Sequence, residues 1–130
     1  MRAPLLALAF LFAFPIPQTS QTPTSQTLTS GIDTNLRGLS SSDSVLWATG
    51  SNGVILRSPD SGKSWTRLHI DNADAAADFR GVQSFGPNIA YIFSVGTDNK
   101  SHIYKTSDAG QTWHTQYSDP RPAFFLDALV

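Results

Sequence analysis

An eight-residue turn motif occurs twice in this 130-residue chain. Residues 58–65 read SPDSGKSW and residues 106–113 read TSDAGQTW, so a Ser/Thr-x-Asp-x-Gly-x-Ser/Thr-Trp pattern returns after 48 residues. A repeat of that period is typical of solenoids and propellers. The chain is therefore expected to be built from one repeated structural unit.

The residues on the N-terminal side of the motif align as well. Residues 36–39 (LRGL) match residues 79–82 (FRGV), and residues 45–50 (VLWATG) match residues 89–94 (IAYIFS). The offset grows from 43 to 48 because a turn-rich loop in the second unit is longer than its counterpart in the first. Repeats tolerate insertions in such surface loops, so the whole unit is repeated and not the motif alone.

Each unit contains four short runs rich in β-branched and aromatic residues, separated by turn signals, and this pattern predicts four strands. The expected strands are 36–42, 45–50, 53–58 and 64–70 in the first unit, and 79–85, 89–95, 101–106 and 112–118 in the second. Four antiparallel strands in about 45 residues describe a propeller blade. The predicted fold is an all-β propeller over residues 32–130, with blades at about 34–71 and 78–119 and the first strand of a third at about 123–130.

Two blades and one strand do not close a propeller. Closed rings have about four to eight blades, because an open array leaves unpaired strand edges and exposed faces between blades. Residues 126–129 (LDAL) align with residues 79–82 and so begin a third unit. We expect the chain to be the N-terminal part of a longer protein, and self-assembly of the short chain is the alternative.

Every side chain of the repeated motif has a structural role in a turn between the third and fourth strands. The aspartate can accept hydrogen bonds from backbone N–H groups, and the glycine can adopt a positive φ. The hydroxyls can bond across the hairpin, and the tryptophan starts the fourth strand and buries its ring between sheets. We therefore interpret the two aspartates as structural and not as a catalytic pair. The residues so assigned are Ser58, Asp60, Gly62, Ser64 and Trp65, and Thr106, Asp108, Gly110, Thr112 and Trp113.

The N-terminal quarter of the chain, residues 1–31, is typical of an exported protein. Met1-Arg2 is basic, and an apolar run from Leu5 to Phe14, too short to span a bilayer, follows it. This order predicts a secretory signal at residues 1–17 and an exported, periplasmic or extracellular protein with no integral membrane span after signal removal. Residues 18–31 are almost entirely Gln, Thr, Ser and Pro, which predicts a disordered spacer.

Charge and composition exclude several classes of partner and site. The net charge is −1, and the nine basic residues form no cluster, which argues against a nucleic-acid partner. The chain has no cysteine, which excludes thiol catalysis and cysteine-based metal sites.

The repeated motif resembles the Asp-box, or bacterial neuraminidase repeat, of sialidases, sortilin-type receptors and other propellers. The wider pattern of LRGL, LWATG and VILRSPDSGKSW is similar to the photosystem II stability/assembly factor family, especially its exported relatives in non-photosynthetic bacteria. The resemblance runs from about residue 34 to the end of the chain. It implies a β-propeller that acts as a binding or scaffold protein towards a protein or polymer partner.

Three charged residues recur at one position of the repeat. Arg37, Arg80 and Asp127 all lie in the first strand of successive blades, and that strand lines the central channel of propellers. They could form a shared binding surface for a polar or anionic partner. In the assembly-factor family, arginines of the propeller face are implicated in partner binding, which the resemblance carries over to Arg37 and Arg80. The alternative is a salt bridge between blades, for instance between Arg80 and Asp127.

An enzymatic function is the alternative hypothesis, and the sequence shows no set of catalytic residues that would support it. A sialidase-like glycosidase needs an arginine triad, a Tyr nucleophile with a Glu partner and an acid Asp. All ten acidic residues are Asp, so such a site would lie outside this chain. No Gly-x-Gly-x-x-Gly opens a helix, as a redox cofactor would require. The three histidines, His69, His102 and His114, lack metal-ligand spacing, so we predict no catalytic residue, metal or cofactor here.

Overall fold

The computed structural model describes residues 25, 27–71, 73, 75–97, 100–121 and the backbone of 123–124. The predicted signal, most of the predicted spacer and Asp127 lie outside these residues, so the assignments of residues 1–17 and 18–31 stay predictions.

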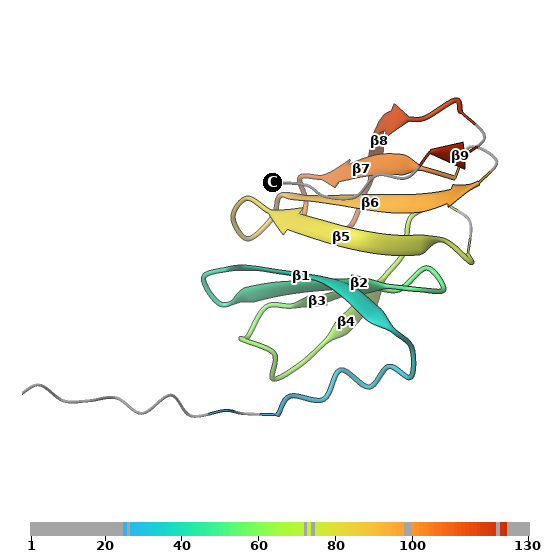
Figure 1. Ribbon diagram of the computed structural model, residues 1–130. Helices are drawn as coiled ribbons and strands as arrows, with labels where there is room; N and C mark the ends of the chain where they lie inside the picture. Colours follow the sequence, from blue (N-terminus) through green and yellow to red (C-terminus); the bar gives the residue numbers. More distant parts are fainter. Residues whose placement is uncertain are drawn as a thin grey trace, which may run out of the picture.

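Two antiparallel sheets of four consecutive strands lie face to face (Figure 1). The strands of the first sheet follow the order of the sequence: β1 (Leu36–Ser42), β2 (Val45–Gly50), β3 (Ile55–Ser58) and β4 (Thr66–Leu68). Those of the second sheet do the same: β5 (Asp78–Ser84), β6 (Ala90–Thr97), β7 (His102–Thr106) and β8 (His114–Ser118). The predicted all-β architecture of four-stranded blades is confirmed.

The pairing of the first three strands is the same in both sheets. Trp47 lies opposite Ser40 and Arg57 in the first sheet, and Tyr91 lies opposite Gln83 and Lys105 in the second. These pairs fix which residues of the two blades are equivalent. The fourth strands begin at Thr66 and His114, one residue after the motif tryptophan and two residues later than the predicted bounds of 64–70 and 112–118.

One hydrophobic core joins the two blades. Its buried residues are Val45, Trp47 and Ile55 of the first sheet and Phe79, Val82, Ala90, Ile92 and Tyr104 of the second. Trp47 packs between the blades, because its side chain is fully buried and meets the Trp113 ring edge-on with centroids 6.0 Å apart. A smaller cluster of Ala48, Val54 and Leu56 lies within the first sheet, against Trp65 and Ile32.

Polar contacts also cross between the blades. The hydroxyls of Ser40 and Ser84 are 2.8 Å apart, and the Ser84 N–H donates to the Ser40 hydroxyl at 2.9 Å. The Arg57 side chain donates to the carbonyl of Pro87 at 2.9 Å and lies 5.5 Å from the centroid of the Trp47 ring. These bonds fix how one blade is rotated against the next.

Short segments at each end of the array make contacts like those between the blades. Leu28, in the predicted spacer, lies against Gly62, as Leu68 of β4 lies against Gly110. At the other end, β9 (Ala123–Phe124) pairs with Gly96 and Thr97 at the end of β6. Residues 125–130, which would continue the predicted third blade, lie outside the described part of the chain.

Candidate binding site on the inner strands

The strands β1 and β5 carry one β-bulge each, at the same place in the repeat. The pairing register shifts between Leu36 and Gly38 in β1 and between Phe79 and Gly81 in β5, so the extra residue is Arg37 in one strand and Arg80 in the other. A bulge re-aims the side chain of its extra residue and is frequent beside functional sites. The repeat therefore places an arginine at a β-bulge in the first, inner strand of each blade, β1 and β5.

The two bulges lie next to one another because the backbones approach closely at their glycines. A Cβ atom on Gly38 would lie 2.9 Å from the Cα atom of Gly81 and 2.5 Å from the Thr49 hydroxyl, so no larger residue fits there without displacement. A Cβ atom on Gly81 would collide with the ring of Phe93. This explains the repeated Leu/Phe-Arg-Gly-Leu/Val pattern. The glycines permit the close approach of β1 to β5, and each arginine is the extra residue of a bulge.

Asp78 connects the two arginines. The Arg37 Nε atom lies 2.9 Å from one carboxylate oxygen of Asp78, and the Arg80 Nε atom lies 3.2 Å from the other. The Ser51 hydroxyl accepts from Arg37 Nε at 3.2 Å and donates to Asp78 at 3.1 Å. The two guanidinium groups are therefore held on either side of one carboxylate, across the junction of the blades.

Two cations and one anion give this cluster one net positive charge at the surface. The side chains of Arg37 and Arg80 are 40% and 46% exposed, so solvent screens the ion pairs and their contribution to stability is small. Both contacts to Asp78 use Nε. The terminal Nη groups are the part of a guanidinium that binds a carboxylate in a forked, bidentate way, so the cluster is suited to an anionic group of a partner.

The sequence predicted Arg37 and Arg80 as a shared surface, and the structure places them together. Asp127, the third predicted member, lies outside the described residues, and so does the suggested Arg80–Asp127 salt bridge. Sequence reasoning missed Asp78, because the strand was predicted to begin one residue later. Its counterpart in the first unit is Asn35, so the repeat alignment gave no carboxylate to look for.

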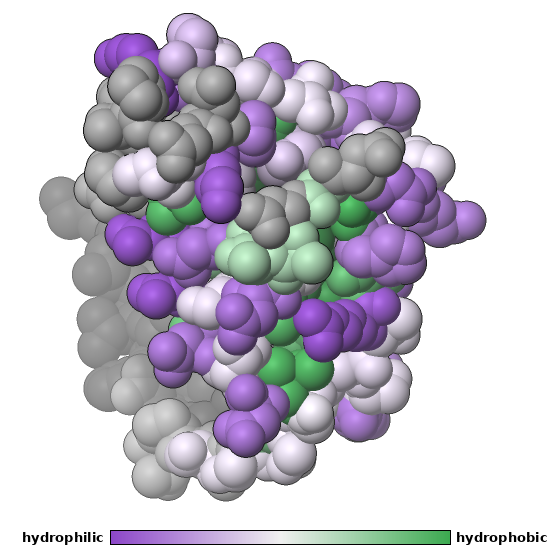
Figure 2. Space-filling model, turned by 90° about the vertical axis from the view of Figure 1, so that its right-hand side faces the viewer, coloured by the Kyte–Doolittle hydropathy of each residue, from purple (hydrophilic) through white to green (hydrophobic). Residues whose placement is uncertain are grey.

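The surface at this end of the sheets is mostly hydrophilic. Strands β1 and β5 begin on the side of the molecule that faces right in Figure 1, and Figure 2 shows that side directly. Hydrophilic side chains surround a central group of hydrophobic ones there. A mixed surface of this kind fits a partner that carries both charged and apolar groups.

The aspartates of the two motifs are engaged inside their own turns. Asp60 accepts from the Ser64 N–H at 2.9 Å, the Ser64 hydroxyl at 2.7 Å and the Ser58 hydroxyl at 2.8 Å. The Ser58 hydroxyl accepts in turn from the Gly62 N–H at 2.7 Å. The second motif repeats every bond, and the members of that network are Thr106, Asp108, Gly110 and Thr112.

These hydrogen bonds favour the charged form of both aspartates. Donation by the backbone and side chain of Ser64, and then by Ser58, lowers the pKa of Asp60 to about 2. Donation by the side chain and backbone of Thr112, and then by Thr106, lowers the pKa of Asp108 to about 2. Carboxylates with such low pKa values are poor proton donors at neutral pH, which suits a structural role better than acid catalysis.

The turn also imposes a left-handed backbone. Gly62 and Gly110 both have a φ of 88°, and the preceding residues, Ser61 and Ala109, have φ values of 61° and 63°. The glycine requirement has a second cause, since a Cβ atom on Gly110 would lie 2.4 Å from Leu68 of the other blade. The positive φ of Ser61 and Ala109 was not foreseen from the sequence.

A tyrosine–aspartate–arginine cluster lies at the end of β8. The buried carboxylate of Asp119 accepts from Tyr117 at 2.8 Å and from Arg121 at 2.6 Å and 2.8 Å. Donation to Asp119 raises the pKa of Tyr117, and the Arg121 guanidinium holds the pKa of Asp119 well below its usual range. Tyr117 is therefore held as a neutral phenol, which is the opposite of an activated nucleophile.

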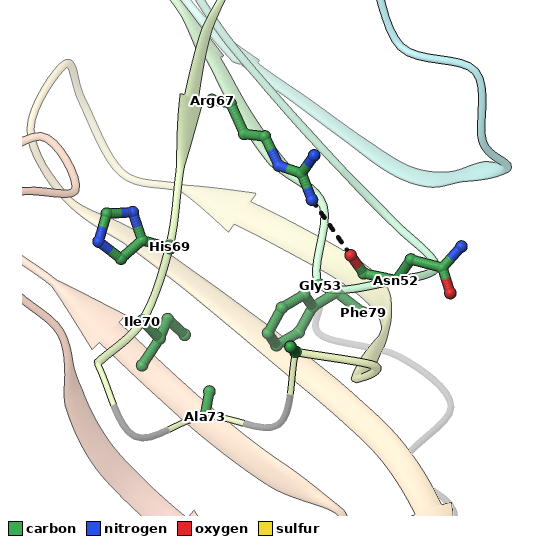
Figure 3. A pocket seen from close by; sticks show the side chains of 8 residues that line it. Asn52, Gly53, Arg67, His69, Ile70, Ala73 and Phe79 are labelled. Atoms are coloured by element: carbon green, nitrogen blue, oxygen red, sulfur yellow. Dashed lines mark hydrogen bonds between the residues drawn. The ribbon is translucent and has the colours of Figure 1, made fainter.

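A small pocket opens beside the connection between the blades (Figure 3). It measures about 180 Å³, and Arg67 donates to the Asn52 carbonyl at 3.3 Å beside it. The His69 ring lies on the other side of the chain from the Arg67 side chain, so the two basic groups do not converge (Figure 3). The pocket offers no paired charges like those of the arginine cluster.

The residues that the structure describes contain no group of three His, Cys, Asp or Glu side chains placed to hold a metal ion. In the same part of the chain, no helix is long and apolar enough to cross a membrane.

Comparison with known proteins connects this geometry to a family. The sequence pattern of the family described as "Photosynthesis system II assembly factor YCF48" matches residues 19–124. The "Photosystem II assembly lipoprotein Ycf48" of Synechococcus sp. (strain CC9902) is 29% identical over 73 residues, which are 56% of this chain and 20% of that protein. The "Vacuolar protein sorting/targeting protein 10" of Colletotrichum graminicola is 33% identical over 92 residues, which are 71% of this chain and 6% of that protein.

Solved structures agree in fold. "YCF48 bound to D1 peptide" has a TM-score of 0.54 at 24% identity, and the match covers 64% of this chain and 25% of that one. "YCF48 from Cyanidioschyzon merolae" has a TM-score of 0.55 at 19% identity, over 67% of this chain and 28% of that one. The chain thus spans between 6% and 28% of the length of these relatives. By its matched sequence pattern, this chain belongs to the family of the photosynthesis system II assembly factor YCF48.

Proposed function

We propose that this chain forms part of an exported scaffold protein that binds a polypeptide partner through the arginine cluster of its inner strands. The observation that carries the proposal is the placement of Arg37 and Arg80 on either side of Asp78, with one net positive charge and both side chains half exposed. A related protein is described as bound to a D1 peptide, which supports a protein partner of this class. The basic start and apolar run of residues 1–14 support export.

The chemistry of the cluster suggests how a partner would be recognised. Guanidinium groups bind carboxylates through paired N–H donors, and such charge-assisted bonds contribute about 1.5–3 kcal/mol each. Asp78 holds both arginines in place before binding, which reduces the side-chain entropy lost when the partner arrives. A carboxylate of the partner polypeptide is therefore the group that we expect at the terminal Nη groups of the arginines.

The test uses the D1 peptide as the probe, labelled with a fluorophore, and follows binding by fluorescence anisotropy. Arg37→Gln and Arg80→Gln should each weaken binding by about tenfold or more, because each removes one charged donor. Arg67→Gln is the matched control, since Arg67 lies on β4 and donates to a backbone carbonyl beside the pocket.

A second probe separates charge from shape. A D1 peptide whose carboxylates are replaced by amides should bind the unchanged protein as weakly as the native peptide binds the two variants. Equal affinity of the unchanged protein and both arginine variants for the native peptide would refute the proposed site. An enzymatic role stays an alternative that no described side-chain arrangement favours.

A further inference from the structure

The pocket of Figure 3 and the arginine cluster are built from the same two stretches of the chain. Ser51 and Asp78 belong to the cluster, and the residues that follow them, Asn52 and Phe79, line the pocket. Consecutive Cα atoms are only about 3.8 Å apart. The two sites therefore adjoin at two points, and one extended segment of a partner can contact both.

Backbone hydrogen bonds hold the two sites in a fixed relation. The Ser51 N–H donates to the Asn35 carbonyl at 3.0 Å, and the Gly53 N–H donates to the Ala77 carbonyl at 2.8 Å. Asn35 directly precedes β1 and Ala77 directly precedes β5, so the β2–β3 hairpin is joined to the start of both inner strands. A binding surface fixed in this way loses little conformational entropy when a partner binds.

The inner walls of the pocket are apolar. Figure 3 shows Ile70, Ala73 and Phe79 around one space. The Phe79 side chain is 1% exposed and belongs to the core that the blades share, and Ile70 packs against that core. Arg67 lies at the rim, where its guanidinium is directed to the Asn52 carbonyl. A group that enters the pocket therefore extends the hydrophobic core, which favours an apolar group.

The volume of the pocket limits the size of that group. It measures about 180 Å³. Sites for drug-sized molecules measure about 300–1,000 Å³, whereas an apolar cavity of about 150 Å³ can hold a benzene molecule. The pocket is thus large enough for one aliphatic or aromatic side chain and too small for a larger ligand.

We propose that this pocket binds one apolar side chain of the partner polypeptide, of about the size of leucine, one or two residues away from the carboxylate that the arginines bind. The inference rests on the proposed function and adds the sequence that the partner must carry. An extended chain advances about 3.3–3.6 Å per residue, which matches the close spacing of the two sites. The carboxylate then sets the orientation of the partner, and the apolar side chain is the buried anchor.

The test compares labelled D1 peptides that carry either leucine or alanine at the positions one and two residues from a carboxylate. Fluorescence anisotropy should show about tenfold tighter binding of the best leucine peptide, the gain expected when a side chain of this size is buried. Ala73→Leu fills the pocket from the connection between the blades and should abolish this gain. Ala76→Leu is the matched control, because Ala76 is an exposed residue of the same connection that does not line the pocket. Urea denaturation checks that both variants are folded.

Arg37→Gln separates this inference from the function on which it rests. If both sites act, the substitution weakens the leucine and alanine peptides by the same factor and leaves their ratio unchanged. Equal binding of the two peptides to the unchanged protein, with Arg37→Gln weakening both, would overturn the pocket and leave the arginine site standing. Peptides that do not bind, or that bind Arg37→Gln as tightly as the unchanged protein, would overturn both proposals.

Discussion

At the residue scale, Asp60 and Asp108 determine how the turns respond to pH. Their pKa values are about 2 in the folded protein, against 3.8 for an unperturbed aspartate, because the charged form accepts three hydrogen bonds in each turn. A lowered pKa in the folded state means that the stabilisation is complete above about pH 4 and is lost as the pH falls towards 2.

Replacing one of these carboxylates tests this dependence. We expect Asp108→Asn to lower the denaturation midpoint at pH 7, since the amide nitrogen replaces one of the two oxygens that accept from the Thr106 and Thr112 hydroxyls and cannot itself accept. The difference from the unchanged protein should shrink between pH 4 and pH 2, where the native carboxylate becomes protonated. Urea titrations at several pH values measure both effects. The control is Asp33→Asn, at an exposed residue, and a pH-independent deficit in Asp108→Asn would contradict the explanation.

At the element scale, the turn between β7 and β8 is both a hairpin and part of the contact between blades. Gly110 has a positive φ, and a Cβ atom there would lie 2.4 Å from Leu68 and 3.3 Å from Trp47 of the first sheet. Gly86 also has a positive φ, of 94°, but a Cβ atom there would meet nothing within 4 Å. The two glycines therefore separate the cost of backbone strain from the cost of crowding.

We expect Gly86→Ala to lower the free energy of unfolding by about 1–2 kcal/mol, because an L-residue resists positive φ. Gly110→Ala should cost more, since the added methyl group would also lie 3.3 Å from the buried Trp47 ring and would displace the Leu68 methyl group. Chemical denaturation of both variants gives the comparison. Equal losses of unfolding free energy in the two variants would show that the residue at position 110 is not crowded by the neighbouring blade.

The elements also show how far the sequence predicts the structure. Alternation and turn signals place the eight blade strands to within a few residues, because these signals are local. The fourth strands begin later than predicted, since the motif turn occupies the chain as far as Trp65 and Trp113. The bridging role of Asp78 was not predictable, because it depends on how two bulged strands meet across blades. A sequence pattern gives no information on the distance between residues of two different blades.

At the scale of the whole molecule, the two blades share one core and should unfold together. Eight buried residues from both sheets form a single cluster, so opening either blade exposes the apolar surface of the other. The smaller cluster behind the first sheet involves no residue of the second. Cooperative unfolding of this molecule therefore depends on the contact between the blades. Of the two motif tryptophans, Trp113 lies at that contact and Trp65 does not.

Trp113 and Trp65 are a matched pair for testing this dependence. The Trp113 ring packs edge-on against Trp47 of the other blade, whereas Trp65 packs against the small cluster of its own blade. Trp113→Ala should therefore cost about 0.5–1.5 kcal/mol more than Trp65→Ala, the contribution of an aromatic pair beyond area. In hydrogen exchange, Trp113→Ala should weaken protection in both sheets, because the shared core is damaged. If amides of the first sheet keep their native protection while those of the second lose it, the blades are independent units and the shared core does not couple them.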